Sequence, residues 1–329
     1  MKSRITMLTA ALVWTVFTFA QSVKIDQTNF PDKQFRESLL KQDFGKDGVI
    51  SASEMSNIKM LDVSAWDIND LTGIHLFTSM KELDCSLNNL RRLDVSKCKA
   101  LVTLWCQNNQ LEEIILNKSK IEWVRAEENQ FQTLDISNCP ELLTMYCEKN
   151  RLVSINASNS PKLRTLHSYN NELTSVNLRG CTALRYFYTE CNQLTQLDFS
   201  SCADLWEVWC SNNNINGENM DKMLKSLRKV TPEDDCEIFI YDPISNYEGN
   251  LCTKSQISIA KSRGWFISKH IGDEEWAPYE GSEPTGIDGV EADNGINENN
   301  TTRYNLRGQR VNNNYRGIVI ENGKKIIVK

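Results

Sequence analysis

The side chains best suited to recognition in this sequence are rings and carboxylates that recur at fixed spacings. Large rings at solvent-facing strand positions have little packing role, so a cluster of them favours a surface that binds a partner. Flat rings suit protein and sugar faces alike, and rings that stack on one another would instead stabilise a sheet. The candidate ligand-binding rings are Trp105, Trp123, Tyr146, His167, Tyr169, Tyr186, Tyr188 and Trp209.

The sequence offers little that points to catalysis. Glycoside hydrolysis needs two carboxylates at a fixed separation, and nothing in the sequence fixes such a pair. The histidines, His75, His167 and His270, lack a nucleophile motif around them. We therefore expect a protein that is not an enzyme and has no catalytic residues. Four glutamates should form an acidic flank beside the rings: Glu127, Glu128, Glu148 and Glu190.

One segment near the N-terminus could hold calcium. Asp43, Asp47 and Glu54 fall at positions 1, 5 and 12 of a loop that resembles an EF-hand, although Gly45 replaces the usual ligand at position 3. The alternative is a helix start at which Ser51 is the N-cap and Glu54 completes a capping box. Apart from this possible calcium ion, we expect no cofactor.

The elements that position these residues follow from a repeat. Asparagines recur 21, 20, 21, 21, 21 and 21 residues apart, and an apolar anchor lies five residues before each. The pattern L-x-x-L-x-(C/small)-x-x-N-x-L is the signature of leucine-rich repeats. An asparagine at a buried turn satisfies backbone groups with both its donor and its acceptor. The asparagines are Asn88, Asn109, Asn129, Asn150, Asn171, Asn192 and Asn213.

The repeat predicts an α/β leucine-rich repeat solenoid. Each repeat contributes one short strand to a parallel concave sheet and buries its apolar face against its neighbours. The return path, as in residues 90–98, is too short for a helix, so the convex side should consist of turns or short 3₁₀ segments. The candidate rings fall just before, just after or three residues after the anchors, and should project from the concave face.

The cysteine pattern favours free thiols. The eleven cysteines include four at one inward strand position and four at a second, both filled by Ala, Ser or Thr in other repeats. Side chains stacked in register make poor disulfide geometry, and a thiol fits a small buried slot. Cys236 and Cys252 lie outside these positions and could pair. The repeated positions hold Cys85, Cys106, Cys147 and Cys210, and Cys98, Cys139, Cys181 and Cys202.

Composition divides the chain into six segments. Residues 1–20 read as a signal peptide, 21–57 as a helical N-terminal cap with the EF-hand-like loop, and 58–217 as repeats. Residues 218–280 should form an α/β C-terminal cap, 281–302 a linker, and 303–329 a β-hairpin tail. Within the caps we expect helices at 32–42, 218–230 and 253–263, and strands at 237–241 and 265–271.

The net charge of the chain narrows the classes of partner that we expect. The formal charge of −6 becomes −8 once the signal peptide removes Lys2 and Arg4. An acidic chain disfavours nucleic acid and anionic membranes as partners. The apolar stretch of the signal peptide is short for a membrane span, so we expect no membrane insertion of the mature chain.

The repeats resemble those of bacterial internalin-like surface proteins through L-x-x-L-x-C-x-x-N-x-L and L-D-x-S-x-C across residues 58–217. The ending at 304–311 and 317–329 is similar to a short type IX secretion sorting domain. These resemblances imply export to the surface of a Gram-negative bacterium, or alternatively the periplasm. They also imply recognition or adhesion, with a host or bacterial surface protein or glycan as the partner. The alternative is a structural or assembly component without a specific ligand.

Overall fold

The computed structural model describes residues 22–272 and 275–282, and the backbone of four strands between residues 303 and 328. Contacts divide the chain between Leu184 and Arg185 into two compact units. The predicted signal peptide at 1–20 and most of the predicted linker at 281–302 lie outside the described residues. No helix in the described part of the chain is long and apolar enough to cross a membrane.

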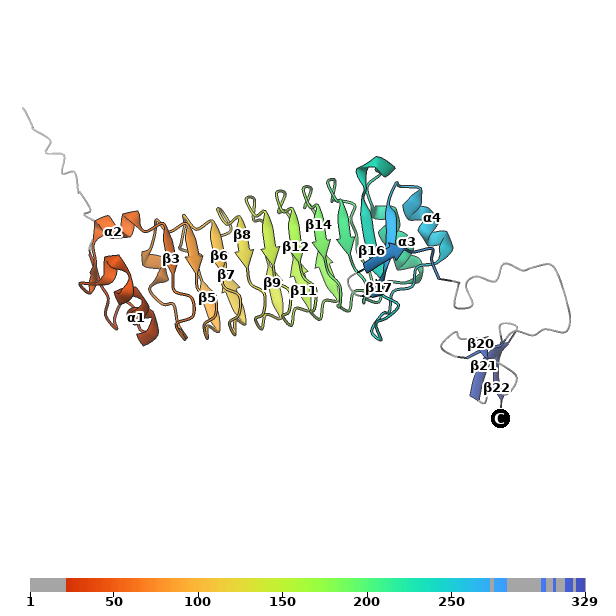
Figure 1. Cartoon of the computed structure of the whole chain (residues 1–329), viewed down its shortest axis with the longest axis horizontal. Coiled ribbons are helices and arrows are strands. Elements are labelled where there is room, and N and C mark those ends of the chain that lie inside the picture. Colours follow the sequence, from red (N-terminus) through yellow and green to blue (C-terminus); the bar gives the residue numbers. More distant parts are fainter. Residues whose placement is uncertain are drawn as a thin grey trace, which may run out of the picture. The chain divides into compact units, whose positions relative to one another are not determined.

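The first unit is a leucine-rich repeat solenoid, as the sequence predicts. Its main sheet has six parallel strands in chain order (Figure 1). Each strand is three residues long and has a buried central anchor, such as Leu104 or Met145, that packs against the anchors of its neighbours. The strands are β3 Met60–Asp62, β4 Glu82–Asp84, β6 Thr103–Trp105, β8 Trp123–Arg125, β10 Thr144–Tyr146 and β12 Thr165–His167.

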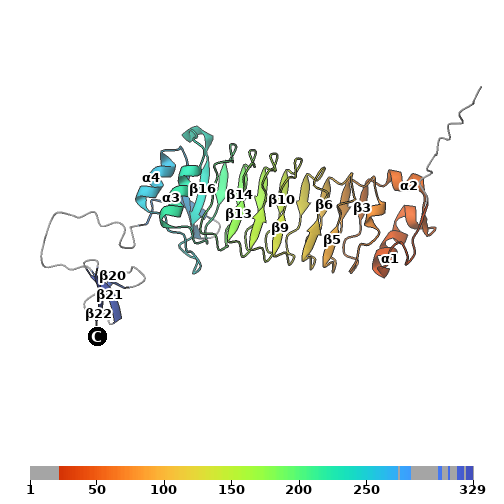
Figure 2. The ribbon, with the colours of Figure 1, turned by 180° about the vertical axis from the view of Figure 1, so that it is seen from behind.

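The return side of the repeats differs from the prediction of turns or 3₁₀ segments. Short strands there pair in parallel, in the orders β5-β7 and β9-β11-β13 (Figure 2). The 3₁₀ helix η2, Ile74–Leu76, lies in the irregular first turn. The L-D-x-S segment buries a central residue such as Leu134 or Ile155, and so satisfies the alternation of a strand. These strands are β5 Arg92–Asp94, β7 Glu113–Ile115, β9 Thr133–Asp135, β11 Ser154–Asn156 and β13 Ser175–Asn177.

An N-terminal cap covers the first turn. Helix α1, Lys33–Lys41, begins after Asp32, whose carboxylate accepts a hydrogen bond from the Phe35 backbone N–H at 2.9 Å. The buried ring of Phe30 lies 5.4 Å from Phe35 and 6.2 Å from Phe77 of the first turn. The other cap elements are β1 Val23–Lys24, η1 Asp43–Gly45, β2 Val49–Ile50 and α2 Ala52–Asn57.

The second unit begins with two repeat strands and ends in a mixed cap. Strands β14 to β17 are parallel, whereas β18 pairs antiparallel with β17. Helices α3 and α4 match the two predicted helices, although α3 ends at Ser226 rather than at residue 230. The elements are β14 Tyr186–Tyr188, β15 Glu207–Trp209, α3 Gly217–Ser226, η3 Pro232–Asp234, β16 Glu237–Tyr241, α4 Lys254–Lys261, β17 Phe266–Gly272 and β18 Glu275–Pro278.

The tail forms a small antiparallel sheet in the order β20-β19-β21-β22. Strands β21 and β22 make the hairpin that the sequence suggests, with Ile318 opposite Ile327. The tail strands are β19 Arg303–Asn305, β20 Arg310–Val311, β21 Gly317–Glu321 and β22 Lys324–Val328.

Candidate binding surface

Rings from neighbouring repeats meet on the solvent-facing side of the first unit's sheet. Trp123 in β8 lies 5.8 Å from Tyr146 in β10, measured between ring centroids. Tyr146 lies 4.6 Å from His167 in β12, and His167 lies 6.2 Å from Tyr169. The parallel register places Tyr146 directly opposite His167. Four of the predicted rings therefore form one continuous group, which we call the first ring cluster: Trp123, Tyr146, His167 and Tyr169.

Charge and burial define the chemistry of the first ring cluster. The guanidinium carbon of Arg125 lies 5.7 Å from the centre of the Tyr146 ring, within cation–π range. Burial lowers the pKa of His167 to about 4, so its imidazole is neutral at physiological pH. Trp123 keeps 39% of its surface exposed. The cluster is therefore a neutral aromatic surface with one cation beside it.

Trp105 extends this column of residues without joining the first ring cluster. It is half-buried in β6 and pairs in register with Arg125. Arg125 thus stands between Trp105 and Tyr146 in the column that follows the anchors.

The second unit has its own ring cluster, built partly by the cap. Tyr188 in β14 lies 5.6 Å from Trp209 in β15, and Trp209 lies 4.6 Å from Phe239 in β16 and 5.0 Å from Trp276 in β18. His270 packs 5.0 Å from Trp276. A hollow of about 350 Å³ lies beside these rings, lined in part by Phe239 and Trp276. We call Tyr188, Trp209, Phe239, His270 and Trp276 the second ring cluster.

A half-buried carboxylate organises this second ring cluster. The Glu207 carboxylate accepts hydrogen bonds from the Tyr188 hydroxyl at 3.1 Å and from the Trp209 indole N–H at 2.6 Å. Burial, followed by the charge of Glu207, raises the pKa of Tyr188 well above its usual range. Tyr186 belongs to a separate group, because it packs 5.5 Å from Trp206 with Arg185 over both rings.

The sequence prediction missed three members of the second ring cluster. Phe239 follows the buried Ile238 in a predicted strand, and the position rule used for the repeats would have found it. Trp276 lies in β18, for which the sequence gives no repeat signal. His270 lies opposite Trp276 and could not have been placed without that strand.

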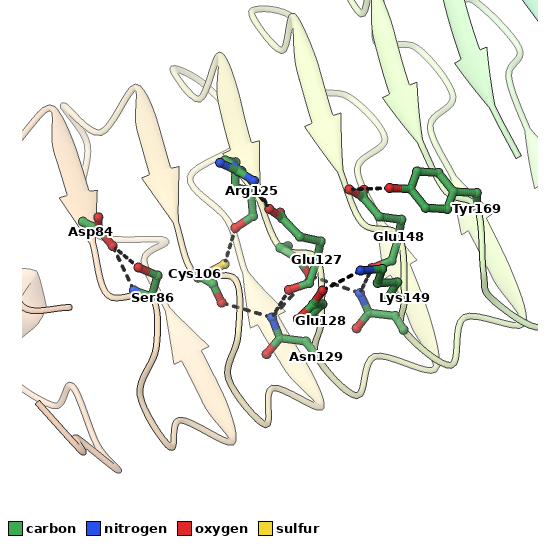
Figure 3. A network of polar contacts seen from close by, with 12 residues as sticks. Asp84, Ser86, Cys106, Arg125, Glu127, Glu128, Asn129, Glu148, Lys149 and Tyr169 are labelled. Atoms are coloured by element: carbon green, nitrogen blue, oxygen red, sulfur yellow. Dashed lines mark hydrogen bonds and ion pairs between the residues drawn. The ribbon is translucent and has the colours of Figure 1, made fainter. Parts of the chain in front are cut away.

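The predicted acidic flank divides into buried and exposed residues. Glu127 and Glu148 are buried, with 6% and 7% of their surface exposed, so they are not the solvated flank that we expected. Glu128 is exposed and pairs with Lys149 at 2.7 Å. Figure 3 shows Glu127 beside Arg125 and Glu148 beside Tyr169, one repeat apart. Burial raises the pKa of Glu148, and the nearby charge of Glu127 raises it further.

The asparagines have the structural role that the sequence predicts. The amide N–H₂ group of Asn129 donates to the carbonyls of Cys106, Ala126 and Glu127 at 3.0–3.3 Å. Its carbonyl oxygen accepts from the Leu111 N–H at 2.9 Å. One side chain thus closes its own turn and ties it to the preceding repeat.

The cysteines, all of which lie in the described residues, carry free thiols, including Cys236 and Cys252. The thiols of Cys85, Cys106 and Cys147 donate to backbone carbonyls of the next repeat at 3.4, 3.3 and 3.1 Å. These contacts run from repeat to repeat, which makes the cysteine positions part of the scaffold beneath the rings.

The cap loop adopts the capping box. The Ser51 side chain accepts from the Glu54 N–H, and the Glu54 carboxylate accepts from the Ser51 N–H at 2.8 Å. Asp43 faces Lys46 at 2.6 Å, and Asp47 caps the Val49 N–H at 3.0 Å. Within the described chain, no three His, Cys, Asp or Glu side chains gather as metal ligands. Calcium binding at the cap stays a prediction and would require these carboxylates to turn.

Comparison with known proteins does not assign this chain to a family. No protein-family model matches the chain. No curated protein matches it either. Among solved structures, it is similar to the functional domain of InlJ from Listeria monocytogenes, described as including a cysteine ladder. The TM-score is 0.34 and the identity 18%, over 69% of each chain.

Proposed function

We propose that this chain is an exported, non-enzymatic recognition or adhesion protein that binds a protein or glycan through the rings on its sheet. The observation that carries this proposal is the first ring cluster, which places an exposed indole, a neutral imidazole and two phenols on neighbouring repeats. Rings that retain exposure after packing on one another are suited to act as interface anchors.

The partner that this surface suits is a surface protein or glycan of a host or of another bacterium. Stacking on flat rings requires no charge, and Arg125 beside Tyr146 adds a donor for a carboxylate or a hydroxyl group. The location that we propose is the secreted fraction or the cell surface, with the periplasm as the alternative. The competing function is a structural or assembly component of the cell surface that has no specific ligand.

The test is a glycan array together with a pull-down from host and bacterial surface proteins. The variant Trp123→Ala with Tyr146→Ala should lose at least about tenfold in affinity, since central aromatic anchors contribute about 1.4 kcal/mol or more. The matched control is Tyr247→Ala, which removes a ring that is 87% exposed in a loop of the second unit. A ligand whose affinity survives the double change would refute binding through the first ring cluster. Absence of any ligand would favour the structural role.

The tail offers a separate test of location. Deleting residues 303–329 should leave the melting temperature of the repeats unchanged and move the protein from the surface to the periplasmic fraction. Cell fractionation and differential scanning fluorimetry measure the two outcomes. Unchanged surface location would exclude a sorting role for the tail, and loss of folding would make the tail part of the cap.

A further inference from the structure

The hollow of about 350 Å³ beside the second ring cluster lies where three strands of the second unit meet. Strands β16 and β17 run parallel there, and β18 returns antiparallel along β17. The register places Glu237 opposite Phe266 and Phe239 opposite Ser268, so these side chains share one face of the sheet. Ligand pockets measure about 300–1,000 Å³, so this volume suits a small occupant such as a single side chain. The lining includes Glu237, Phe239, Phe266, Ser268 and Trp276.

Two rings line the hollow with surface that a ligand can reach. Phe266 keeps 48% of its surface exposed. Trp276 is half-buried, and its ring lies 4.7 Å from Phe239 and 5.0 Å from His270. Phe239 is itself buried, so it supports Trp276 from below and does not form part of the open surface. The hollow therefore offers two flat apolar faces, and the packing of Trp276 lowers the entropy that its ring would lose on binding.

The charged group in the hollow is the carboxylate of Glu237. Its Oε1 accepts a hydrogen bond from the Ser268 hydroxyl. Glu207 lies directly opposite on β15, and its carboxylate accepts from the Tyr188 hydroxyl and the Trp209 indole N–H. Within the described residues these donors are neutral, and neither carboxylate forms an ion pair. Like charges directly opposite each other on adjacent strands are destabilising, so this pair leaves negative charge that is not compensated.

The cations on the neighbouring strands are directed elsewhere. Lys269 follows Ser268 on β17, and the alternation of a strand turns it to the other face of the sheet. His270 directs its Nδ1 towards the Asp242 carboxylate at 3.3 Å. Arg185, just before β14, lies over the two rings of its own separate group. These residues therefore do not supply the positive charge that would balance the two glutamates.

The rings and the carboxylates together select the class of ligand. Two carboxylates disfavour an anion, and a neutral ligand such as a sugar would leave their repulsion in place. The guanidinium of arginine is planar, stacks on aromatic rings and offers paired N–H donors to a carboxylate, whereas an ammonium is a compact and strongly hydrated charge.

We propose that the hollow binds an arginine side chain of a partner protein. The guanidinium lies against the rings of Trp276 and Phe266 and donates to Glu237, while Glu207 adds negative potential from the neighbouring strand. This site is distinct from the first ring cluster, because the two belong to different units, and it stands whether or not that cluster binds a ligand.

The probe for this site is a blocked tripeptide, N-acetyl-alanyl-arginyl-alanine amide, titrated into the mature full-length chain at low salt. The citrulline analogue keeps the shape of the arginine side chain without its charge, and the lysine analogue keeps the charge without the plane. Two-dimensional NMR of the indole N–H signals reports binding, and Trp276→Phe identifies the signal of Trp276. Low salt is used because ions screen an exposed charge pair.

We expect the arginine probe to bind saturably and the citrulline analogue to bind at least about tenfold more weakly, because hydrogen bonds between charged groups are the strong ones. Glu237→Gln should weaken the arginine probe by a similar factor and leave the citrulline analogue unchanged. Phe266→Ala, which removes an exposed ring, should weaken both probes. The matched control is Glu275→Gln, which removes the same charge from an exposed residue of β18 that does not line the hollow, and it should change neither affinity.

Four outcomes would overturn the proposal. They are no saturable binding of the arginine probe, equal affinity for the citrulline or lysine analogue, an effect of Glu275→Gln as large as that of Glu237→Gln, and a shift of the Trp276 signal with maltotriose but not with arginine. The double variant Trp123→Ala with Tyr146→Ala should bind the arginine probe like the wild type. Failure of the first ring cluster and failure of this site are therefore distinguishable.

Discussion

Asn129 and Glu127 belong to the same turn after β8, and they are buried almost equally, with 8% and 6% of their surface exposed. The two side chains differ in how their polar atoms are hydrogen-bonded. The amide of Asn129 reaches three carbonyls and one N–H, whereas one oxygen of Glu127 has no hydrogen-bond partner. Two polar side chains that are buried to the same extent in one turn therefore differ in how many of their polar atoms are hydrogen-bonded. The substitutions below test this contrast.

The largest effect should come from Asn129→Ala. The change removes the donor to three carbonyls and the acceptor for the Leu111 N–H, so we expect a loss of about 3–5 kcal/mol in the free energy of unfolding. Urea denaturation measures it. The control is Gln132→Ala, at the exposed position just before β9, which should change the free energy of unfolding by less than about 0.5 kcal/mol. Similar losses of unfolding free energy in the two variants would contradict a structural role for the asparagine.

A cysteine one repeat earlier, whose carbonyl accepts a hydrogen bond from Asn129, should be sensitive to a change in side-chain volume. Cys106 is fully buried and donates to the Arg125 carbonyl. Cys106→Val overfills the slot and removes the donor, and should cost about 1–3 kcal/mol. Cys106→Ser should cost less than about 1 kcal/mol, because Ser168 already fills the equivalent buried position. Thermal unfolding of the two variants would contradict this reading if the serine proved the worse substitution.

A smaller and pH-dependent effect should follow from Glu148→Gln measured in chelator. The pKa of Glu148 is raised in the folded state, mainly by burial, so the folded state binds its proton at a higher pH than the unfolded state does. The wild type should therefore gain stability relative to the variant as the pH falls from 7 towards the unfolded value of about 4.3. Above that window the variant should be the more stable protein. If the stability of the wild type and of the variant changed with pH in the same way, burial would not be raising the pKa of Glu148.

The smallest effect should be a gain in stability from Leu87→Asn. The residue before each of the recurring asparagines has a left-handed backbone conformation, with φ of 55° at Leu87, Asn108 and Asn212. Leucine tolerates this conformation poorly, whereas asparagine adopts it readily, so the change should add up to about 1 kcal/mol. Leu87 is 58% exposed, and little packing is lost. A decrease in the melting temperature would mean that Leu87 makes a contact more important than its backbone strain.

The repeat fold was predictable because each position recurs and its residue types follow burial. The anchors, the ladder asparagines and the capping box at Ser51 all follow from local rules. The return strands were missed because three residues carry too little alternation to distinguish a strand from a turn. The burial of Glu127 and Glu148 was missed for a different reason. Sequence spacing places a side chain on a face, but neighbouring side chains decide whether water reaches it.

The hydrogen bonds between consecutive repeats also constrain which insertions and deletions this protein can tolerate. The Asn150 amide donates to the Ala126 carbonyl, the Cys147 thiol to the His167 carbonyl, and the Leu152 N–H to Asn171, each linking consecutive repeats. An insertion of a few residues would shift several such columns out of register together. Removing one whole repeat would instead join equivalent positions and restore each bond. Mutational length changes in this chain should therefore survive in steps of one repeat, and a lineage could lengthen or shorten its sheet without redesigning it.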